Sequence, residues 1–508
     1  MSRRRPVRVA VVLIAALLAA CSSGGPRRAA PSTSTRPTAT TEAPTTTTTV
    51  ALPAPTPIAW TRCHGRFDCA RITVPADYAD PSGPTLQVAV IRRPAGDPAQ
   101  RIGTLIMNPG GPGSSGVRRV QRGFTLSPEV ARRFDIVGFD PRGIGESTPI
   151  TCGSAVPAFQ ATDLAPDTDQ EQLQLEAAAK TVADQCAATE GVRLAHLGTV
   201  DVARDVEMLR RDLGEAQVSF VGLSYGTLIA LEWAEAYPTS VRAMVLDGVA
   251  DPTSDGRAIS KEQLEAIDDT FSAIASACTA DPSCPLTPDG GLEAGYDQLS
   301  RRIEAGEVTG DGVGPTQLAY AFFWSTYGQE HWPELWRALH AGLRGDLSGI
   351  AAMSHAFEGL VPYAPFALIS CLDSPHEIGP VAWRDDAKRS AKVSPRFGAI
   401  LSNQLLPCAY WPQSSFRPHK IEAPGTPPVL VMGSTGDAAT PYPQAVRVAD
   451  DLAHGVLLTV DMEGHVAIGE SDCATAAATR YLVDLTTPAP GTHCSAAGPA
   501  SGAPTGPH

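Results

Sequence analysis

Short apolar runs rich in β-branched and aromatic residues alternate with segments of helical periodicity over most of the chain. This alternation predicts an α/β fold, a mostly parallel central sheet with helices on both faces. The candidate strands are Leu86–Ile91, Thr104–Met107, Asp135–Phe139, Val218–Val221, Ala243–Leu246, Val429–Met432 and Gly455–Val460. Candidate helices at Val200–Leu213 and Thr227–Ala236 each lie between two of these strands.

The alternation stops between about Asp251 and Ile421, where helical spacing and a Trp/Tyr-rich stretch replace it. A chain of 508 residues is long enough for a large core and an inserted second domain. We therefore expect a helical cap inserted between two core strands. The predicted division is a signal peptide at 1–20, a tether at 21–57, core at 58–250, cap at 251–421, core at 422–495 and a tail at 496–508.

The first residues are typical of an export signal. Several arginines precede the apolar stretch Val9–Ala20, which is too short to span a bilayer. Its end, Leu-Ala-Ala-Cys at 18–21, resembles the bacterial lipobox, so Cys21 would be diacylated and would anchor the protein to the outer face of the bacterial cell membrane. An ordinary secretory signal is the alternative. The Ser-Arg-Arg at 2–4 leaves general secretion and twin-arginine export both open.

Residues 22–57 consist almost entirely of Ser, Thr, Pro, Ala and other small or polar residues. Such a segment cannot bury enough apolar surface to order itself, so it is expected to be a disordered tether. The tail at 496–508 has a similar composition.

The chain has eleven cysteines, and lipidation of Cys21 would leave ten. An even number fits an oxidising compartment, where disulfides persist. Pairing sequence neighbours proposes five bridges, although sequence alone does not fix the connectivity. They are Cys63–Cys69, Cys152–Cys186, Cys278–Cys284, Cys371–Cys408 and Cys473–Cys494.

The net charge of the chain and the spacing of its cysteines and histidines exclude some classes of binding partner. A net charge of −14 argues against nucleic acid, since phosphate binding needs a basic face. There is no C-x-x-C pair and no Cys/His cluster at zinc spacing, so no metal is expected. No cofactor is expected either, and the membrane is a partner only through the lipid anchor.

The run Gly-Leu-Ser-Tyr-Gly at 222–226 has a strand before it and a helix after it. This is the context in which G-x-S-x-G is a nucleophile elbow, with Ser224 as the nucleophile. The glycines admit strained backbone angles and close neighbours. The following helix points its positive end at the serine oxygen.

A glycine-rich loop at 108–116 follows the strand Thr104–Met107. In such a fold this loop supplies one backbone N–H of the oxyanion hole, and the residue after the nucleophile supplies the other. We expect these donors to be Gly111 and Tyr225, with Gly110 as the neighbouring alternative. A phosphate loop would need a following Gly-Lys-Ser/Thr, which is absent.

The base and acid should follow the serine in the order acid, then histidine. His465 lies in the loop after the last predicted strand, whereas His493 is close to the free tail and His196, His419 and His454 lie before that strand. Asp437 follows the penultimate strand and would orient the imidazole of His465. The rival acid is Asp247, which more plausibly accepts bonds from backbone amides.

Two other groups have a structural and a functional interpretation. Arg142, in Asp-Pro-Arg-Gly at 140–143, could touch substrate, but an arginine here more often pins a loop. In the cap, Trp324, Tyr327, Trp332 and Trp336 could line a pocket, although aromatic residues at helical spacing are more often core.

Together these residues resemble the tripeptidyl-aminopeptidase-like α/β-hydrolases of actinobacteria, relatives of proline iminopeptidase. The matching segments are 74–78, 108–116, 139–143, 198–205, 222–227, 245–249, 437–441 and 464–465, with a Cys-rich end. The resemblance implies a secreted exopeptidase that removes short peptides from free N-termini. Such an enzyme needs an anion for the substrate ammonium, and Glu330 and Glu334 of the cap are candidates.

The leading hypothesis is therefore a serine aminopeptidase or protease. A cell-surface carboxylesterase or lipase with the same triad is the alternative, because acyl-enzyme chemistry serves amides and esters alike. An inactive hydrolase fold acting as a binding lipoprotein is a remote third, since every triad position is filled. Sequence does not indicate the oligomeric state.

Overall fold

The computed structural model describes residues 52–254, 261–412, 414 and 416–496. The predicted signal peptide, the lipobox with Cys21, nearly all of the tether and nearly all of the tail lie outside the described residues.

A ten-stranded sheet forms the centre of the described chain, in the order β1-β2-β3-β5-β4-β6-β7-β8-β9-β10. Along this order, the neighbouring pairs β1–β2, β2–β3 and β3–β5 are antiparallel. All the remaining neighbouring pairs, from β5–β4 to β9–β10, are parallel. The bounds are β1 (Thr61–Cys63), β2 (Phe67–Pro75), β3 (Thr85–Arg93), β4 (Gly103–Asn108), β5 (Phe134–Phe139), β6 (Val218–Leu223), β7 (Val241–Asp247), β8 (Val429–Gly436), β9 (Gly455–Glu463) and β10 (His493–Ser495).

The seven predicted strands are β3 to β9, and the predicted α/β class is confirmed. Every residue of β4, β5 and β6 is buried, which explains why these strands appear in the sequence as continuous apolar runs. Three strands were not predicted. β1 and β10 have only three residues each, and β2 carries charged residues on the antiparallel edge of the sheet.

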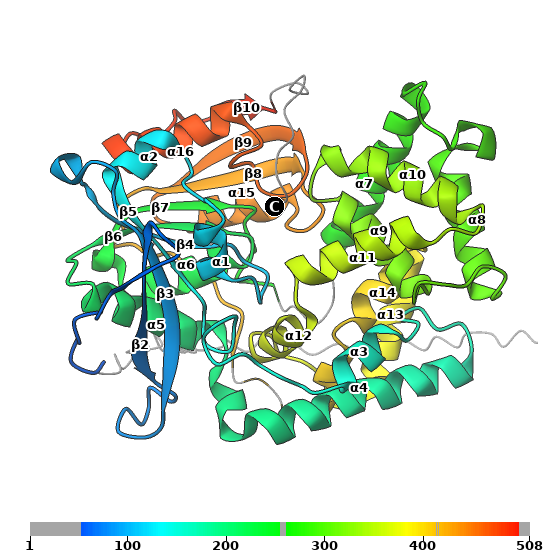
Figure 1. Ribbon diagram of the computed structural model, residues 1–508, viewed down its shortest axis with the longest axis horizontal. Helices are drawn as coiled ribbons and strands as arrows, with labels where there is room; N and C mark the ends of the chain where they lie inside the picture. Colours follow the sequence, from blue (N-terminus) through cyan, green and yellow to red (C-terminus); the bar gives the residue numbers. More distant parts are fainter. Residues whose placement is uncertain (1–51, 255–260, 413, 415, 497–508) are drawn as a thin grey trace, which may run out of the picture. The chain divides into compact units, whose positions relative to one another are not determined.

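Helices pack on both faces of the sheet (Figure 1). One hydrophobic cluster joins the sheet to α5 (Thr199–Asp212), α6 (Gly226–Ala236) and α15 (Tyr442–Asp451). A second cluster joins it to α1 (Gly116–Gln121), α2 (Pro128–Arg133) and α16 (Asp472–Asp484). The predicted helices Val200–Leu213 and Thr227–Ala236 are α5 and α6.

A third hydrophobic cluster belongs to a helical layer beside the sheet, on the right of Figure 1. Most of this layer follows β7, where the cap was expected. Its helices are α7 (Lys261–Ala280), α8 (Gly291–Glu304), α9 (Pro315–Ser325), α10 (Trp332–Gly342), α11 (Ser348–Leu360), α12 (Tyr363–Leu372), α13 (Pro380–Val393) and α14 (Gly398–Asn403).

The expected core segment 58–250 also contributes to this layer. Between β5 and α5 the chain forms α3 (Ala155–Gln160) and the long α4 (Asp169–Glu190), whose buried side chains belong to the third cluster. Leu175, Ala179 and Val182 recur at helical spacing along that buried face. The cap is therefore built from two excursions of the chain, and the single boundary at Asp251 is too simple.

The structure joins the ten remaining cysteines in the five proposed pairs. Three of the bridges lie in the cap layer. Cys152–Cys186 ties the start of the first excursion to α4, Cys278–Cys284 closes a short loop at the end of α7, and Cys371–Cys408 ties α12 to the segment after α14. Five disulfides indicate folding in an oxidising compartment. Among the helices described, none is both long and apolar enough to cross a bilayer.

Candidate active site

The turn between β6 and α6 holds Ser224 in an uncommon backbone conformation, with φ of +54°. Its N–H donates to Asp247 O at 2.9 Å, and its carbonyl accepts from Thr227 N–H at 2.9 Å. The serine lies immediately before the first turn of α6, so the positive end of the helix faces its side chain. This is the geometry of a nucleophile elbow.

Glycines surround this turn because neighbouring backbone leaves no room for a side chain. A Cβ at Gly222 would lie 2.5 Å from Gly226 O, and a Cβ at Gly226 would lie 2.6 Å from Asn108 O. Gly110, with φ of +95°, is equally confined: its Cβ would lie 2.5 Å from Leu223 O and 2.8 Å from Ser224 Cβ. The glycine-rich loop after β4 is therefore pressed directly against the serine.

His465 and Asp437 form a buried pair at the ends of β9 and β8. His465 Nδ1 and Asp437 Oδ2 are 2.8 Å apart. The other carboxylate oxygen accepts the N–H groups of Ala439 and Thr440, both at 2.9 Å, and the Thr440 hydroxyl donates to Oδ2 at 2.9 Å. These bonds fix the carboxylate, which in turn orients the imidazole ring.

The far nitrogen of His465, Nε2, is buried and has no hydrogen-bond partner in the described protein. Burial opposes protonation of the ring, but the charge of Asp437 and its hydrogen bond outweigh that effect and raise the pKa of His465 above its usual 6.5. The ring is thus held with one nitrogen committed to a carboxylate and the other able to accept a proton.

Asp247, the rival acid, bonds to backbone amides of the loop after His465. Its carboxylate accepts the N–H of Ala467 at 3.0 Å and the N–H of Ile468 at 2.7 Å, and burial raises its pKa to about 6. It therefore holds the loop that follows His465. Next to it, Gly248 leaves space for the ring, since a Cβ there would lie 2.8 Å from His465 Cε1.

The cap contacts the histidine directly through Tyr327. The ring centroids of Tyr327 and His465 are 5.4 Å apart in a T-shaped arrangement. In addition, the backbone N–H of His465 donates to the backbone carbonyl of Tyr327 at 3.3 Å. Gly328 also forms an antiparallel bridge with Gly464. The position of the imidazole therefore depends on both parts of the fold.

The backbone near Ser224 distinguishes the two candidates for the first oxyanion donor. The N–H of Gly110 is already bonded to Asn108 Oδ1 at 2.9 Å. Within the described chain, no hydrogen bond is recorded for the N–H of Gly111 or for that of Tyr225. Both residues line the same cavity as Ser224. This arrangement favours the predicted pair over Gly110.

A cavity of about 670 Å³ opens between the core and the helical layer beside Ser224. Aromatic and aliphatic side chains from the cap cover much of it, among them Tyr320, Phe323, Phe357 and Phe366. Four carboxylates also line it: Glu232, Asp251, Glu358 and Asp373. Sequence reasoning missed these four, although Glu232 stands two helical turns after the Ser224 region on α6, a spacing that indicates the same face.

The two carboxylates expected to bind a substrate amine are not in this cavity. Glu330 and Glu334 belong to the turn before α10 and to α10 itself, and neither is among the cavity-lining residues. Their side chains are 46% and 48% exposed and lie near His331, at 3.3 Å and 3.9 Å. The expectation fails because no local pattern tells which side of a cap helix faces the serine.

Arg142 and the cap aromatics are mostly structural. Arg142 is completely buried and bonds to Asp205 and to backbone carbonyls, which confirms the loop-pinning interpretation. Trp332 and Trp336 belong to the cap's hydrophobic cluster, and Trp324 packs against it. Only Tyr327 of the four lines the cavity.

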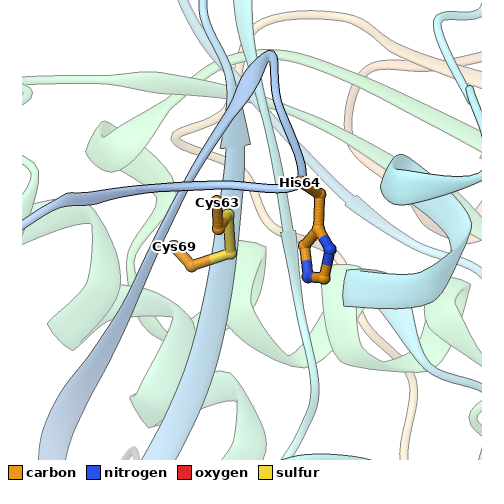
Figure 2. A group of neighbouring side chains, drawn as sticks. All are labelled: Cys63, His64 and Cys69. Atoms are coloured by element: carbon orange, nitrogen blue, oxygen red, sulfur yellow. A yellow bond between two sulfur atoms is a disulfide. The ribbon is translucent and has the colours of Figure 1, made fainter.

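One group of potential metal ligands occurs in the described residues, at the β1–β2 hairpin (Figure 2). It consists of Cys63, His64 and Cys69, but the two sulfurs are joined in a disulfide. A disulfide has no thiolate to offer a metal ion. The group is therefore not a metal site in the oxidised protein.

Comparison with known proteins agrees with this geometry. A family model described as the alpha/beta hydrolase fold matches residues 103–472. Serine protease Hip1 of Mycobacterium tuberculosis is 34% identical over 86% of this chain and 91% of its own length. Carboxylesterase B of the same species is 32% identical, covering 84% and 86%. Tripeptidyl aminopeptidase of Streptomyces lividans is 30% identical, covering 79% of both chains.

The contact between the glycine-rich loop and the serine can be tested by Gly110→Ala. Its added Cβ would displace the backbone around Ser224, and we expect turnover to fall by about 10²-fold, as when an oxyanion donor is lost. The control is Gly123→Ala, which has a similar φ of +110° but open space around its Cβ. Turnover is measured with an ester substrate. Equal losses in both variants would show that backbone strain, and not the contact, is responsible.

Proposed function

The chain belongs to the α/β-hydrolase family and is a serine hydrolase, and from this premise we propose that it is an exported serine peptidase that removes short peptides from free N-termini. The observation that carries the proposal is the buried Asp437–His465 pair beside a cavity that contains Ser224. The names of two relatives, a serine protease and a tripeptidyl aminopeptidase, support a peptidase activity.

In the proposed reaction Ser224 Oγ attacks the scissile carbonyl carbon while His465 Nε2 takes the hydroxyl proton. The N–H groups of Gly111 and Tyr225 stabilise the resulting oxyanion. Collapse of this intermediate breaks the C–N bond, His465 gives its proton to the departing amine, and the acyl group stays on Ser224. A water molecule deprotonated by His465 then hydrolyses that ester.

Asp437 accepts the Nδ1–H bond and stabilises the imidazolium without itself taking the proton. The geometry supports this role, since the carboxylate is fixed by three other hydrogen bonds and its side chain is completely buried. The unpartnered Nε2 of His465 supports the role of base.

The charge of the cavity supports an amine-bearing substrate. Four carboxylates line it, while Lys261 is the one lysine or arginine among the described lining residues. Lys261 is itself paired with Glu265 at 2.6 Å. A cavity with an excess of negative charge favours a cationic ligand such as a peptide with a free N-terminus.

An ester substrate is the second candidate, since one of the relatives is named a carboxylesterase. The acylation chemistry is common to both, and the difference lies in the leaving group that His465 must protonate. The aromatic and aliphatic cavity wall suits an apolar acyl group of either kind.

For localisation, we propose that Cys21 carries a lipid that holds the protein at the outer face of the bacterial cell membrane, with 21–57 as the tether. The lipobox-like sequence and the five disulfides support this placement.

The nucleophile is tested with a fluorophosphonate probe. Ser224 should be labelled, and Ser224→Ala should abolish both labelling and turnover. The control is Ser370→Ala, which changes another serine of the cavity wall and should leave labelling intact. Labelling of Ser224→Ala at the wild-type level would place the nucleophile elsewhere.

The base is tested by the pH dependence of kcat/KM. Activity needs neutral His465, so it should be complete above the pKa of that residue and be lost as pH falls through it. Because Asp437 raises this pKa, the midpoint should lie above 6.5. Asp437→Asn should lower kcat by about 10³–10⁴-fold and move the midpoint to lower pH, whereas exposed Asp450→Asn should change neither. A wild-type midpoint well below 6.5 would contradict the pairing.

The exopeptidase activity is tested with a short peptide amide, its N-acetylated twin and a short-chain ester. A charge-assisted hydrogen bond to the ammonium contributes about 1.5–3 kcal/mol, so acetylation should cost at least about tenfold in kcat/KM. Equal cleavage of both peptides would contradict the aminopeptidase proposal. Fast ester turnover beside negligible peptide cleavage would favour the esterase.

The anchor is tested by expressing Cys21→Ser in a bacterial host. The wild-type protein should partition with membranes, and the variant should be released or remain unprocessed. Membrane partition that is unchanged in Cys21→Ser would rule out lipidation at this residue.

A further inference from the structure

Two of the cavity carboxylates form an acidic corner, which we define as Glu232 of α6 and Asp373, the residue directly after α12. One comes from the core and the other from the cap. Burial raises the pKa of both, to about 7 for Asp373, and the charge of Glu232 contributes to the increase at Asp373. This influence of Glu232 on Asp373 agrees with the place of both side chains in the wall of the same cavity.

Among the residues that the structure describes, no lysine or arginine forms an ion pair with either carboxylate of the corner. Asp373 accepts the N–H of Thr199 at 2.8 Å and the Thr199 hydroxyl at 2.6 Å, and both donors are neutral. The side chain of Glu232 is only 11% exposed, and its buried Oε1 has no hydrogen-bond partner. Glu232 Oε1 lies 3.8 Å from Nε2 of His419, whose side chain is 43% exposed.

Of the other two cavity carboxylates, only Asp251 has a positively charged partner among the described residues. Asp251 is paired with Arg447 at 2.7 Å, so its charge is compensated within the protein. Glu358 accepts an amide N–H from Gln160 at 3.1 Å and comes from α11 on the cap side. A buried carboxylate that is neither paired nor fully hydrogen-bonded is costly, so the corner is the part of the cavity with most to gain from a bound cation.

The corner also lies at a suitable distance from the serine. Ser224, Leu228 and Glu232 all line the cavity, at intervals of four residues that put them on one face of α6 and its preceding turn. Glu232 is six residues after the first residue of α6, about 9 Å along the helix axis. An extended peptide advances about 3.4 Å per residue, so two or three residues would span this distance.

The corner is connected to the proposed oxyanion donor as well. The Tyr225 hydroxyl lies 2.5 Å from the Thr199 hydroxyl, which donates to Asp373. Asp373 is therefore linked through Thr199 to the side chain of Tyr225, the residue whose backbone N–H is the proposed oxyanion donor.

We propose that Glu232 and Asp373 together bind the α-ammonium group of the substrate, with the scissile carbonyl two or three residues away at Ser224. An ammonium supplies three donors and one positive charge, which match the free lone pairs and excess negative charge of the corner. This assignment rests on the proposed exopeptidase function, and it replaces Glu330 and Glu334 as the amine-binding residues.

The test compares kcat/KM for a tripeptide amide and its N-acetylated twin in Glu232→Gln and Asp373→Asn, each of which removes one charge with little change of shape. We expect the preference for the free N-terminus to fall by about tenfold or more in each variant and to approach unity in the double variant. Both rates are measured on one sample, so partial unfolding lowers both rates and leaves their ratio unchanged.

Two variants serve as matched controls: Glu358→Gln removes another charge from the cavity wall, and Glu330→Gln removes one outside the cavity. Both should keep the wild-type preference. Glu232→Ala, which suits a helix, provides a second substitution if Glu232→Gln does not fold.

The outcomes separate this inference from the function on which it rests. If the wild type prefers the free N-terminus and Glu232→Gln and Asp373→Asn retain that preference, the acidic corner is not the amine site, although the exopeptidase function stands. Loss of the preference in Glu358→Gln alone would overturn the assignment in the same way. If the wild type cleaves acetylated and free peptides equally, the exopeptidase function itself fails.

Discussion

The close approach of three backbone segments at Ser224 is the constraint on which the rest of the site depends. Asn108 at the end of β4, Gly110 in the following loop, Gly222 in β6 and Gly226 in α6 approach so closely that a Cβ on any of the three glycines would meet backbone atoms. Because these segments touch, the residue between them must take a positive φ, and the two amides at Gly111 and Tyr225 are brought beside its side chain. Parallel pairing of β4 with β6 sets this spacing, so the sheet itself, and not a flexible loop, positions the reacting groups.

Two carboxylates hold His465 and the loop that follows it, and each has a different partner. Asp437 bonds the imidazole, whereas Asp247 bonds the backbone that follows it. Both strand ends bring an acid to the same edge of the sheet, and a sequence pattern cannot tell which one reaches the ring. The difference arises from the partners: Asp247 accepts from the backbone N–H groups of Ala467 and Ile468, whereas Asp437 is bonded to Nδ1 of His465.

The sequence predicts well where the information is local. Strands β3 to β9, the elbow and the disulfide pairs follow from runs, spacings and parity within short stretches. It predicts poorly where distant segments meet. The first excursion, with α4, was counted as core because its helical spacing does not reveal its partner, and Glu330 and Glu334 were chosen as amine ligands without knowledge of which cap surface faces Ser224. Glu232 was overlooked although its position on α6 relative to Ser224 was available.

The position of Glu232 shows that residues of the core, as well as those of the cap, can determine substrate selectivity. The loops of the core hold the candidate catalytic residues. A sequence-based interpretation therefore assigns substrate selectivity to the cap alone. The structure shows instead that a core helix also forms one wall of the cavity, through Leu228 and Glu232, while the cap supplies Asp373 and most of the aromatic surface. Because α6 begins beside Ser224, the position of a residue along α6 determines how far it lies from this serine. The helices of the cap do not change that distance. A cap rebuilt with other helices would thus change the apolar surface while leaving a carboxylate at a set distance from the serine.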